Sequence, residues 1–218
     1  MAPDRTVRSL RIVQPALVAL GVGLSLGALA FVRLSHDLDC ALVSLRTESP
    51  APSAAGTLER ALAISTDPSL RDVVPAIDLP GNLAARLVPD SGTIAEAKRR
   101  SYSALISLRY ARGDVLGRYL PLAHMGAVDG VAIQGFHRAS EHHFGVPITD
   151  LRLGEALLLC DLAASPNDHP LLNGHAAALD RRNRLLARLR DAGRISGSEY
   201  EVERRRPLSR GSDHRPIW

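Results

Sequence analysis

The sequence is poor in aromatic residues, lysine and cysteine. These shortages limit what can fill the core, which residues carry the positive charge and whether disulfides can stabilise the fold. Only 4% of its 218 residues are aromatic, so Leu, Ala and Val must fill the core, and Ala and Leu favour helices. Lys98 is the single lysine, so the net charge of +4 is carried almost wholly by arginine. Two cysteines, Cys40 and Cys160, are too few for a disulfide framework, and whether they pair cannot be read from the sequence. Cys160 lies in an apolar run, so we expect a buried structural thiol.

The chain also lacks a convincing run of alternating apolar and polar residues. We therefore predict a mainly α fold without a notable sheet. The mild positive charge suits a surface near anionic lipid or a diphosphate ligand. No nucleic-acid-binding motif accompanies this charge, so we do not expect nucleic acid as a partner.

The longest segment without a charge runs from residue 12 to residue 32. It matches the length of about 20 residues that a helix needs to cross the hydrocarbon core. Arg5, Arg8 and Arg11 precede it, which predicts a cytoplasmic N-terminus at 1–11 and an external remainder. A cleaved signal peptide is the rival interpretation, but the apolar run is long for one and no clean A-x-A site follows. We favour an uncleaved transmembrane signal anchor.

Beyond the anchor, the sequence predicts a juxtamembrane segment and linker at 33–56, one globular domain at 57–208 and a tail at 209–218. A short helix is expected at 34–48, and SPAPSAAG at 49–56 is typical of a linker. Prolines interrupt 57–92, and Gly126, Gly130 and Gly135 indicate turns. Gly193 can end a helix, and Ser196 with Glu199 forms an S-x-x-E capping box. Helices are predicted at 94–111, 114–123, 135–143, 151–164, 175–191 and 197–204.

Five blocks in the second half carry a family resemblance. They are GFHRASEHHFG at 135–145, LRLGEALLL at 151–159, LAASPN at 162–167, LDRRNRLLARL at 179–189 and ISGSEYEVERRRPL at 195–208. In this order they resemble the C-terminal half of the peptidoglycan glycosyltransferase domain (family 51) of class A penicillin-binding proteins and their monofunctional relatives. The resemblance implies a lysozyme-like helical glycosyltransferase domain.

Two further blocks resemble family motifs with substitutions. DVLGRYLPLAHMG at 114–126 is similar to EILExYLNxxYFG, with Pro121 in place of the Asn. Arg99 and Arg100 match the basic pair of RKxxEAxxAL, and Ser103 stands at its glutamate. Of the family's GGSTITQQ loop, only the short string SGTI at 91–94 has a counterpart in this sequence.

The family's first motif, EDxxFxxHxGxD, does not occur as a string. Its leading glutamate is the family's catalytic base. Aligning VPAID at 74–78 with the end of the motif puts Asp78 at the final Asp and Asp67 at the leading Glu. A second register puts Ser65 there.

The implied reaction explains which residue types matter. A carboxylate must take the proton of the sugar 4-hydroxyl as it attacks, and cations must meet the charge on the leaving lipid diphosphate. Asp67 is the candidate base, against the plainer interpretation of a turn aspartate before Pro68; Asp72 and Glu96 are further carboxylates. The resemblance also implies a divalent metal such as Mg²⁺ at the diphosphate. The candidate diphosphate-binding residues are Lys98, Arg99, Arg100 and Arg109, with Arg112 beside them, against a solvated helix face.

Two other clusters receive structural interpretations. His137 and Glu141 have a workable ligand spacing, but with His142 and His143 we interpret them as a surface cluster and predict no metal site there. The block from Asp180 to Asn183 matches the family's ERRN. We expect it to tie the last helices to the core, with its charged residues on the outer face.

Two functions remain open. Lys98 has no serine three residues before it, which excludes a serine transpeptidase of the S-x-x-K type. The chain is either a glycan polymerase or a pseudoenzyme that binds lipid-linked disaccharide precursor without polymerising it. The pseudoenzyme would serve as a binding subunit or as an inactive scaffold that contacts other cell-wall synthesis proteins. A non-functional relic of gene decay would have the same sequence features. The missing glutamates favour lost or impaired catalysis. The expected location is the bacterial inner membrane, with one span and a periplasmic domain.

Overall fold

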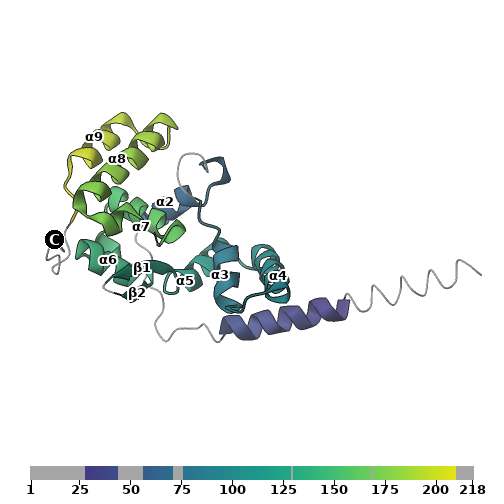
Figure 1. Cartoon of the computed structure of the whole chain (residues 1–218). Helices are drawn as coiled ribbons and strands as arrows, with labels where there is room; N and C mark the ends of the chain where they lie inside the picture. The colour runs from purple at the N-terminus through teal and green to yellow at the C-terminus, as the bar shows by residue number, and fades with distance from the viewer. Residues whose placement is uncertain (1–27, 44–55, 71–75, 129, 168, 210–218) are drawn as a thin grey trace, which may run out of the picture. The chain divides into compact units, whose positions relative to one another are not determined.

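The computed structural model describes residues 28–43, 56–70, 76–128, 130–167 and 169–209 (Figure 1). The chain divides into two units, Met1–Arg46 and Thr47–Trp218. The described part of the first unit is one helix at 28–43. This helix overlaps the one expected at 34–48.

The predicted membrane anchor lies mostly outside the described residues. Of the span at 12–32, only 28–32 fall within the helix at 28–43. No helix in the described part of the chain is both long and apolar enough to cross a membrane. Residues 1–11, most of the linker at 49–56 and the tail after residue 209 also lie outside the described ranges. The anchor stays a prediction.

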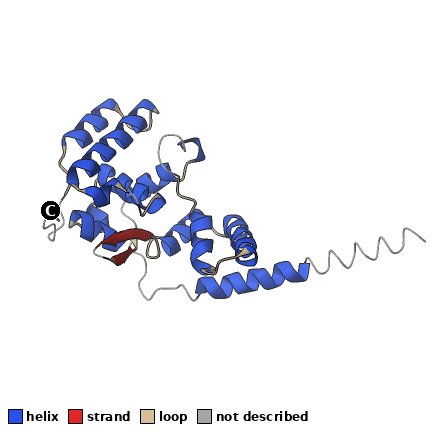
Figure 2. Cartoon of the chain, viewed as in Figure 1, coloured by secondary structure: helices blue, strands red, loops and turns tan. Residues whose placement is uncertain are grey.

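The second unit is mainly helical, which confirms the predicted fold class (Figure 2). The predicted helices from residue 94 onward are all present, although α5 begins two residues earlier than expected and ends before Pro121. The lysozyme-like topology stays a prediction. The elements are α2 (Gly56–Ser65), η1 (Pro68–Leu70), α3 (Leu79–Leu87), α4 (Thr93–Arg109), α5 (Arg112–Tyr119), β1 (His124–Val128), β2 (Val131–Gln134), α6 (Phe136–Phe144), η2 (Ile148–Asp150), α7 (Leu153–Ala164), η3 (Pro170–Asn173), α8 (His175–Asp191) and α9 (Gly197–Arg205).

Helix α7 lies at the centre of this unit. Its residues from Leu153 to Ala163 are all buried, and it contacts α2, α6, α8, α9 and β1. A helix that is apolar all round is stable only when other elements cover every side, so LRLGEALLLCDLAA can be nothing but a core helix in a domain of this size. Each fully buried leucine stabilises the fold by roughly 1.5–3 kcal/mol.

The prolines of 57–92 that lie among the described residues occupy positions that suit them. Pro68 starts η1, and Pro80 lies in the first turn of α3, where a missing backbone donor costs least. Pro89 follows the C-cap residue Val88. Helix α3 packs against α4 and α5, so this short and broken segment forms one side of the cleft described below.

A β-hairpin lies around residue 130, and the turn expected at Gly130 is part of it. Strands β1 and β2 pair antiparallel, with Ala127 opposite Ala132 and one extra residue on β1 between His124 and Ala127. Gly126 lies at this bulge with φ +82° rather than in a turn. The expectation of no strand was wrong because the pair is short. Its available signal was Asp129-Gly130 between apolar residues, a typical hairpin turn sequence.

Helices α8 and α9 lie side by side at the C-terminal end (Figure 1). Gly193 has the predicted left-handed conformation (φ +69°) after α8. The capping box is half formed: Ser196 Oγ accepts from the Glu199 backbone N–H at 3.1 Å. The Glu199 carboxylate instead pairs with Arg60 of α2 at 2.5 Å, which joins α9 to the first helix of the domain.

Candidate functional site

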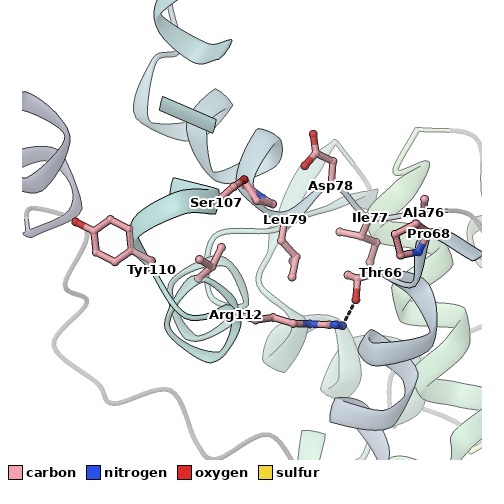
Figure 3. Close-up of a pocket in the computed structure, with 11 residues that line it drawn as sticks. Thr66, Pro68, Ala76, Ile77, Asp78, Leu79, Ser107, Tyr110 and Arg112 are labelled. Carbon is pink, nitrogen blue, oxygen red and sulfur yellow. Dashed lines mark hydrogen bonds between the residues drawn. The ribbon is translucent and has the colours of Figure 1, made fainter. Parts of the chain in front are cut away.

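A cleft of about 770 Å³ lies where the segment after α2, the start of α3 and the α4–α5 junction meet (Figure 3). Three of its described lining residues carry ionisable side chains: Asp78, Tyr110 and Arg112. The side chain of Tyr110 points away from the others in Figure 3. The lining residues are Thr66, Pro68, Ala76, Ile77, Asp78, Leu79, Pro80, Ser107, Tyr110, Arg112 and Val115.

Asp78 lies on the cleft wall and caps α3. Its Oδ1 accepts from the Gly81 backbone N–H at 3.1 Å, which satisfies a donor in the first turn of the helix. The Ile77 N–H donates to the Ser65 carbonyl at 2.9 Å and fixes the preceding backbone to the end of α2. Asp78 is exposed, so the second carboxylate oxygen can face a ligand while the first one caps.

Arg112 is the one cation among the described lining residues. It is the first residue of α5, and its guanidinium reaches back to the C-terminal end of α2. Nη2 donates to the Leu62 carbonyl at 3.1 Å and to Thr66 Oγ1. The sequence placed Arg112 only at the margin of the basic set, and its role in the cleft depends on contacts 46 and 50 residues apart.

Asp67 lies between two lining residues but is not itself among the described residues that line the cleft. Its Oδ1 accepts from the Ser69 hydroxyl at 2.7 Å and from the Ser69 N–H at 2.9 Å. Its Oδ2 pairs with Arg194 at 2.9 Å. These are the contacts of a turn aspartate that also ties η1 to the segment after α8. The assignment as catalytic base stays a prediction.

The surroundings of Asp67 make it a weaker base. The two hydrogen bonds from Ser69 contribute most to lowering the pKa of Asp67 below its usual value. The positive charges of Arg194 and Arg112 lower this pKa further. A general base works best when its pKa lies near the operating pH, so these contacts oppose proton abstraction.

The basic residues predicted to bind diphosphate lie on α4 and are largely engaged elsewhere. Arg99 donates from Nε to the Val88 carbonyl at 2.8 Å and also bonds the Asp90 carbonyl. Arg100 pairs with Glu96 at 3.2 Å, with its side chain 80% exposed. Lys98 Nζ lies 5.3 Å from the centre of the Tyr102 ring. None of these residues, nor Arg109 at the end of α4, is among the described lining residues of the cleft. Their diphosphate role stays a prediction.

Two positions where the resemblance expects glutamates hold serine: Ser65, in the second register of the first motif, and Ser103. Ser65 is buried, and Ser103 accepts from the Ser107 hydroxyl through its backbone carbonyl at 2.9 Å. Glu96 forms ion pairs with Arg99 and Arg100 on the surface of α4. Asp72 lies outside the described residues.

A buried ionic network holds the C-terminal helices, as expected for the ERRN-like block. Asp161 of α7, with its side chain 2% exposed, receives Arg181 through two bonds of 2.6 and 2.7 Å. His169 Nε2 donates to Asp161 at 2.6 Å, because its Nδ1 accepts from the Leu171 N–H. Burial would raise the pKa of Asp161, but the hydrogen bonds and charges of Arg181 and His169 lower it overall.

The expectation that the charged residues of this block all lie on the outer face was wrong for Arg182. It is 3% exposed and donates to the carbonyls of Arg204 and Arg206 at 2.9 and 2.6 Å. These carbonyls end α9 and would otherwise have no helical partner, so Arg182 binds the last helix to α8.

The cysteines and the histidine cluster behave largely as structural groups. Both cysteines are free thiols; Cys160 is buried, as predicted, and burial raises its pKa to about 12. His137 pairs with Glu141 at 3.5 Å on the surface of α6. His143 is buried, so it does not belong to the surface cluster that the sequence indicated. No group of three or more His, Cys, Asp or Glu suited to a metal occurs among the described residues.

Comparison with known proteins gives this arrangement a family context. A family model described as Transglycosylase matches residues 92–190, which contain α4 to the end of α8 except for the last residue of α8. The chain is 30% identical over 117 residues to penicillin-binding protein 1B of Vibrio cholerae, covering 53% of this chain and 15% of that protein. It is 33% identical over 118 residues to penicillin-binding protein 1B of Buchnera aphidicola, covering 54% and 16%. The Escherichia coli penicillin-binding protein 1B is 30% identical over 109 residues, covering 50% and 13%.

The chain thus spans less than a fifth of the length of the relatives it matches. The matched region supplies the α4–α5 wall of the cleft. The described residues of the other wall are Thr66, Pro68 and 76–80, and they lie upstream of the matched region. Residues 92–190 of this chain are therefore similar to a transglycosylase domain as in class A penicillin-binding proteins.

Proposed function

We propose that this chain is a peptidoglycan glycosyltransferase-like protein that binds lipid-linked disaccharide precursor in the Asp78–Arg112 cleft, with impaired or lost catalysis. The transglycosylase match and the relatives' identity as penicillin-binding proteins support the substrate class. One observation carries the proposal: the cleft joins α4 and α5 of the matched region to Thr66, Pro68 and residues 76–80, and its described lining contains one cation and one carboxylate.

The reaction would join the 4-hydroxyl oxygen of one disaccharide to the anomeric carbon of another. The bond to the lipid diphosphate breaks, the diphosphate leaves with the electron pair, and the hydroxyl proton passes to a carboxylate. Asp78 holds a helix cap, and Asp67 is held by Ser69 and Arg194. Asp is one methylene shorter than Glu, and a misplacement of about 1 Å can cost roughly 100-fold in rate. Binding therefore survives these departures better than catalysis.

A divalent cation such as Mg²⁺ fits the cleft in one mode only. Mg²⁺ usually takes one or two carboxylates plus substrate phosphates, and Asp78 is the one carboxylate among the described lining residues. Asp78 would then hold the cation through the oxygen that does not cap α3. The cation would offset diphosphate charge when bound.

The proposed location is the inner membrane, with residues 1–11 in the cytoplasm and the domain in the periplasm. The uncharged stretch at 12–32 and its preceding arginines support this topology. Alkaline phosphatase fused after Trp218 should be active in a bacterial host, since it folds only after export. An inactive fusion in a full-length, membrane-associated chain would reverse the proposed orientation.

The deciding experiment supplies the purified, detergent-solubilised chain with lipid-linked disaccharide precursor and Mg²⁺. We expect precursor binding with little or no glycan polymer. Three variants run in parallel: Asp67→Ala, Asp67→Glu, which restores the missing methylene, and the matched surface control Asp180→Ala. A gain of polymer in Asp67→Glu would show that carboxylate reach limits catalysis.

Two outcomes would contradict the proposal. Abundant polymer from the wild type that disappears in Asp67→Ala would establish an active enzyme with a shortened base. Absence of both polymer and precursor binding would remove the substrate class and leave only the domain likeness.

A scaffold subunit that binds no precursor is the second candidate. The observation that favours it is the pair of apolar side chains on α4, Ile94 and Leu108, which are 87% and 80% exposed. Side chains of this kind can contact another cell-wall synthesis protein. The precursor-binding arm of the same experiment separates this candidate from the first.

A further inference from the structure

Arg112 is held in the cleft by an anchor that occupies only part of its guanidinium. Thr66 Oγ1 donates to the Leu62 carbonyl at 2.7 Å, so its lone pairs are free to accept from Arg112 Nη2. The Leu62 carbonyl also accepts from Nη2 at 3.1 Å. These bonds use Nη2, and no bond to Nε or Nη1 comes from the described part of the chain.

The anchor fixes a charged group in advance of any ligand. Arginine carries several N–H donors on a rigid plane, so holding one nitrogen sets the direction of the rest. Arg112 is exposed and lines a cleft whose other walls include Leu79 and Ile77 (Figure 3). A cation placed beside apolar walls attracts an anion more strongly than one on an open surface, because water screens it less.

The cations expected from the family resemblance are differently placed. Arg99 is committed to the Val88 and Asp90 carbonyls, and Arg100 to Glu96 on an outer face of α4. Arg112 is instead the first residue of another helix, α5, and it lines the cleft. The cation among the described residues that line the cleft is therefore Arg112 and not the basic pair Arg99 and Arg100 that matches the family motif.

We propose that Arg112, positioned by Thr66, is the residue that binds the diphosphate group of the ligand in this cleft, in place of the basic residues of α4. This inference rests on the proposed function, since it names the contact through which the same cleft holds a lipid diphosphate. Arg112 would donate charge-assisted hydrogen bonds from Nη1 and Nε to phosphate oxygens. Thr66 is a positioning residue: it sets the guanidinium and does not touch the ligand.

A purely structural role for Arg112 is the competing explanation. Its charge lies at the C-terminal end of α2, where a cation satisfies the last carbonyls and the helix dipole. That role predicts a loss of stability on substitution but no specific loss of ligand affinity. A binding measurement therefore separates the two explanations.

The experiment titrates the full chain in detergent with two probes, inorganic diphosphate and farnesyl diphosphate. The variants are Arg112→Gln, the rival Arg100→Gln, and Arg138→Gln as a charge-matched control from the exposed surface of α6. We expect Arg112→Gln to weaken both probes by about tenfold or more, because a charged hydrogen-bond partner is lost. The other two variants should change affinity by less than about twofold. Tighter binding of the prenyl probe would identify a lipid-borne rather than a free diphosphate.

Several results would overturn the assignment. A loss in Arg100→Gln without one in Arg112→Gln would return the site to α4, and equal losses in all three variants would indicate a nonspecific charge effect. If Arg112→Gln does not fold, the Nε–H resonance of Arg112 in the wild type decides: it should shift at saturating diphosphate, and an unmoved signal refutes the contact.

The two proposals fail separately. Undiminished binding of the lipid-linked precursor by Arg112→Gln would sink this inference and leave the proposed function standing. Arg112-dependent diphosphate binding by a chain that does not bind the precursor would do the reverse.

Discussion

Replacing Asp161 with asparagine should destabilise the domain more than any surface substitution. The carboxylate is buried, and it receives three short hydrogen bonds, two from Arg181 and one from His169. In Asp161→Asn, the Arg181 guanidinium (20% exposed) and the His169 imidazole (2% exposed) would face an uncharged amide instead of a carboxylate. Breaking one partner of a buried pair typically costs about 3–5 kcal/mol, and the partial exposure of Arg181 places this case toward the lower end.

Urea unfolding of the full chain in detergent, followed by circular dichroism, measures this cost. With a slope of about 2 kcal/mol per molar urea, the midpoint should fall by roughly 1.5–2 M. Asp180→Asn is the matched control, because Asp180 belongs to an exposed pair with Arg184 on the same region of α8. Exposed pairs of this kind contribute about 0–1 kcal/mol, so its midpoint should move little.

The pH dependence gives a second test of the same reasoning. The folded pKa of Asp161 lies below its unfolded value, so its contribution to stability is fully present above about pH 4. It is lost as the pH falls through the folded pKa. The difference between wild type and Asp161→Asn should therefore be constant from pH 5 to 8 and shrink in acid. A penalty equal to that of Asp180→Asn, or one unchanged at low pH, would refute the account of the network.

Two further predictions concern a thiol and a glycine. The native chain should react with a thiol reagent at Cys40 only, because Cys40 is exposed while Cys160 is buried with a pKa of about 12. Unfolding in urea should make the Cys160 thiol reactive as well. Rapid labelling of Cys160 in the native chain would contradict its burial. Gly126→Ala should cost more than the matched Gly130→Ala, as measured by urea midpoints. Both residues have positive φ, which costs about 1–2 kcal/mol for alanine, but only at Gly126 would the new Cβ lie 2.8 Å from the Pro166 carbonyl oxygen. Equal losses would show that this contact relaxes freely.

The helical fold could be predicted because its signals are local. The run around Leu157 is apolar on every side, which assigns α7 to the core without reference to any other segment. Gly193 and Ser196 mark helix ends through backbone rules that act within a few residues. The hairpin escaped notice because its two strands span only five and four residues, too few for alternation to stand out.

The candidate site was less predictable because its contacts are long-range. Asp67 was a plausible base by position, yet its carboxylate pairs with Arg194, 127 residues later. Arg182 lies next to Arg181 in the sequence, but one reaches the end of α9 and the other the buried Asp161 of α7. Neighbouring residues on a helix point in directions about 100° apart, so a charge run does not say which of its members faces a cleft.

The arginines of α4 that match the family motif are not among the described residues that line the cleft. A motif match gives the order of charged residues along the chain, whereas ligand binding depends on where each charged group lies in the folded structure. On α4, Arg99 is drawn to the carbonyls of the segment before the helix, and Arg100 to Glu96 one turn earlier. Arg112 has no acidic neighbour within its own first turn except Asp114, and it reaches across to the carbonyl end of α2. The cation among the described lining residues of the cleft is therefore Arg112, which the sequence placed only at the margin of the basic set. Arg112 also lowers the pKa of Asp67, after the larger contributions of the Ser69 hydrogen bonds and Arg194. Under the proposed function, Arg112 would favour an anionic ligand and would oppose proton uptake by Asp67.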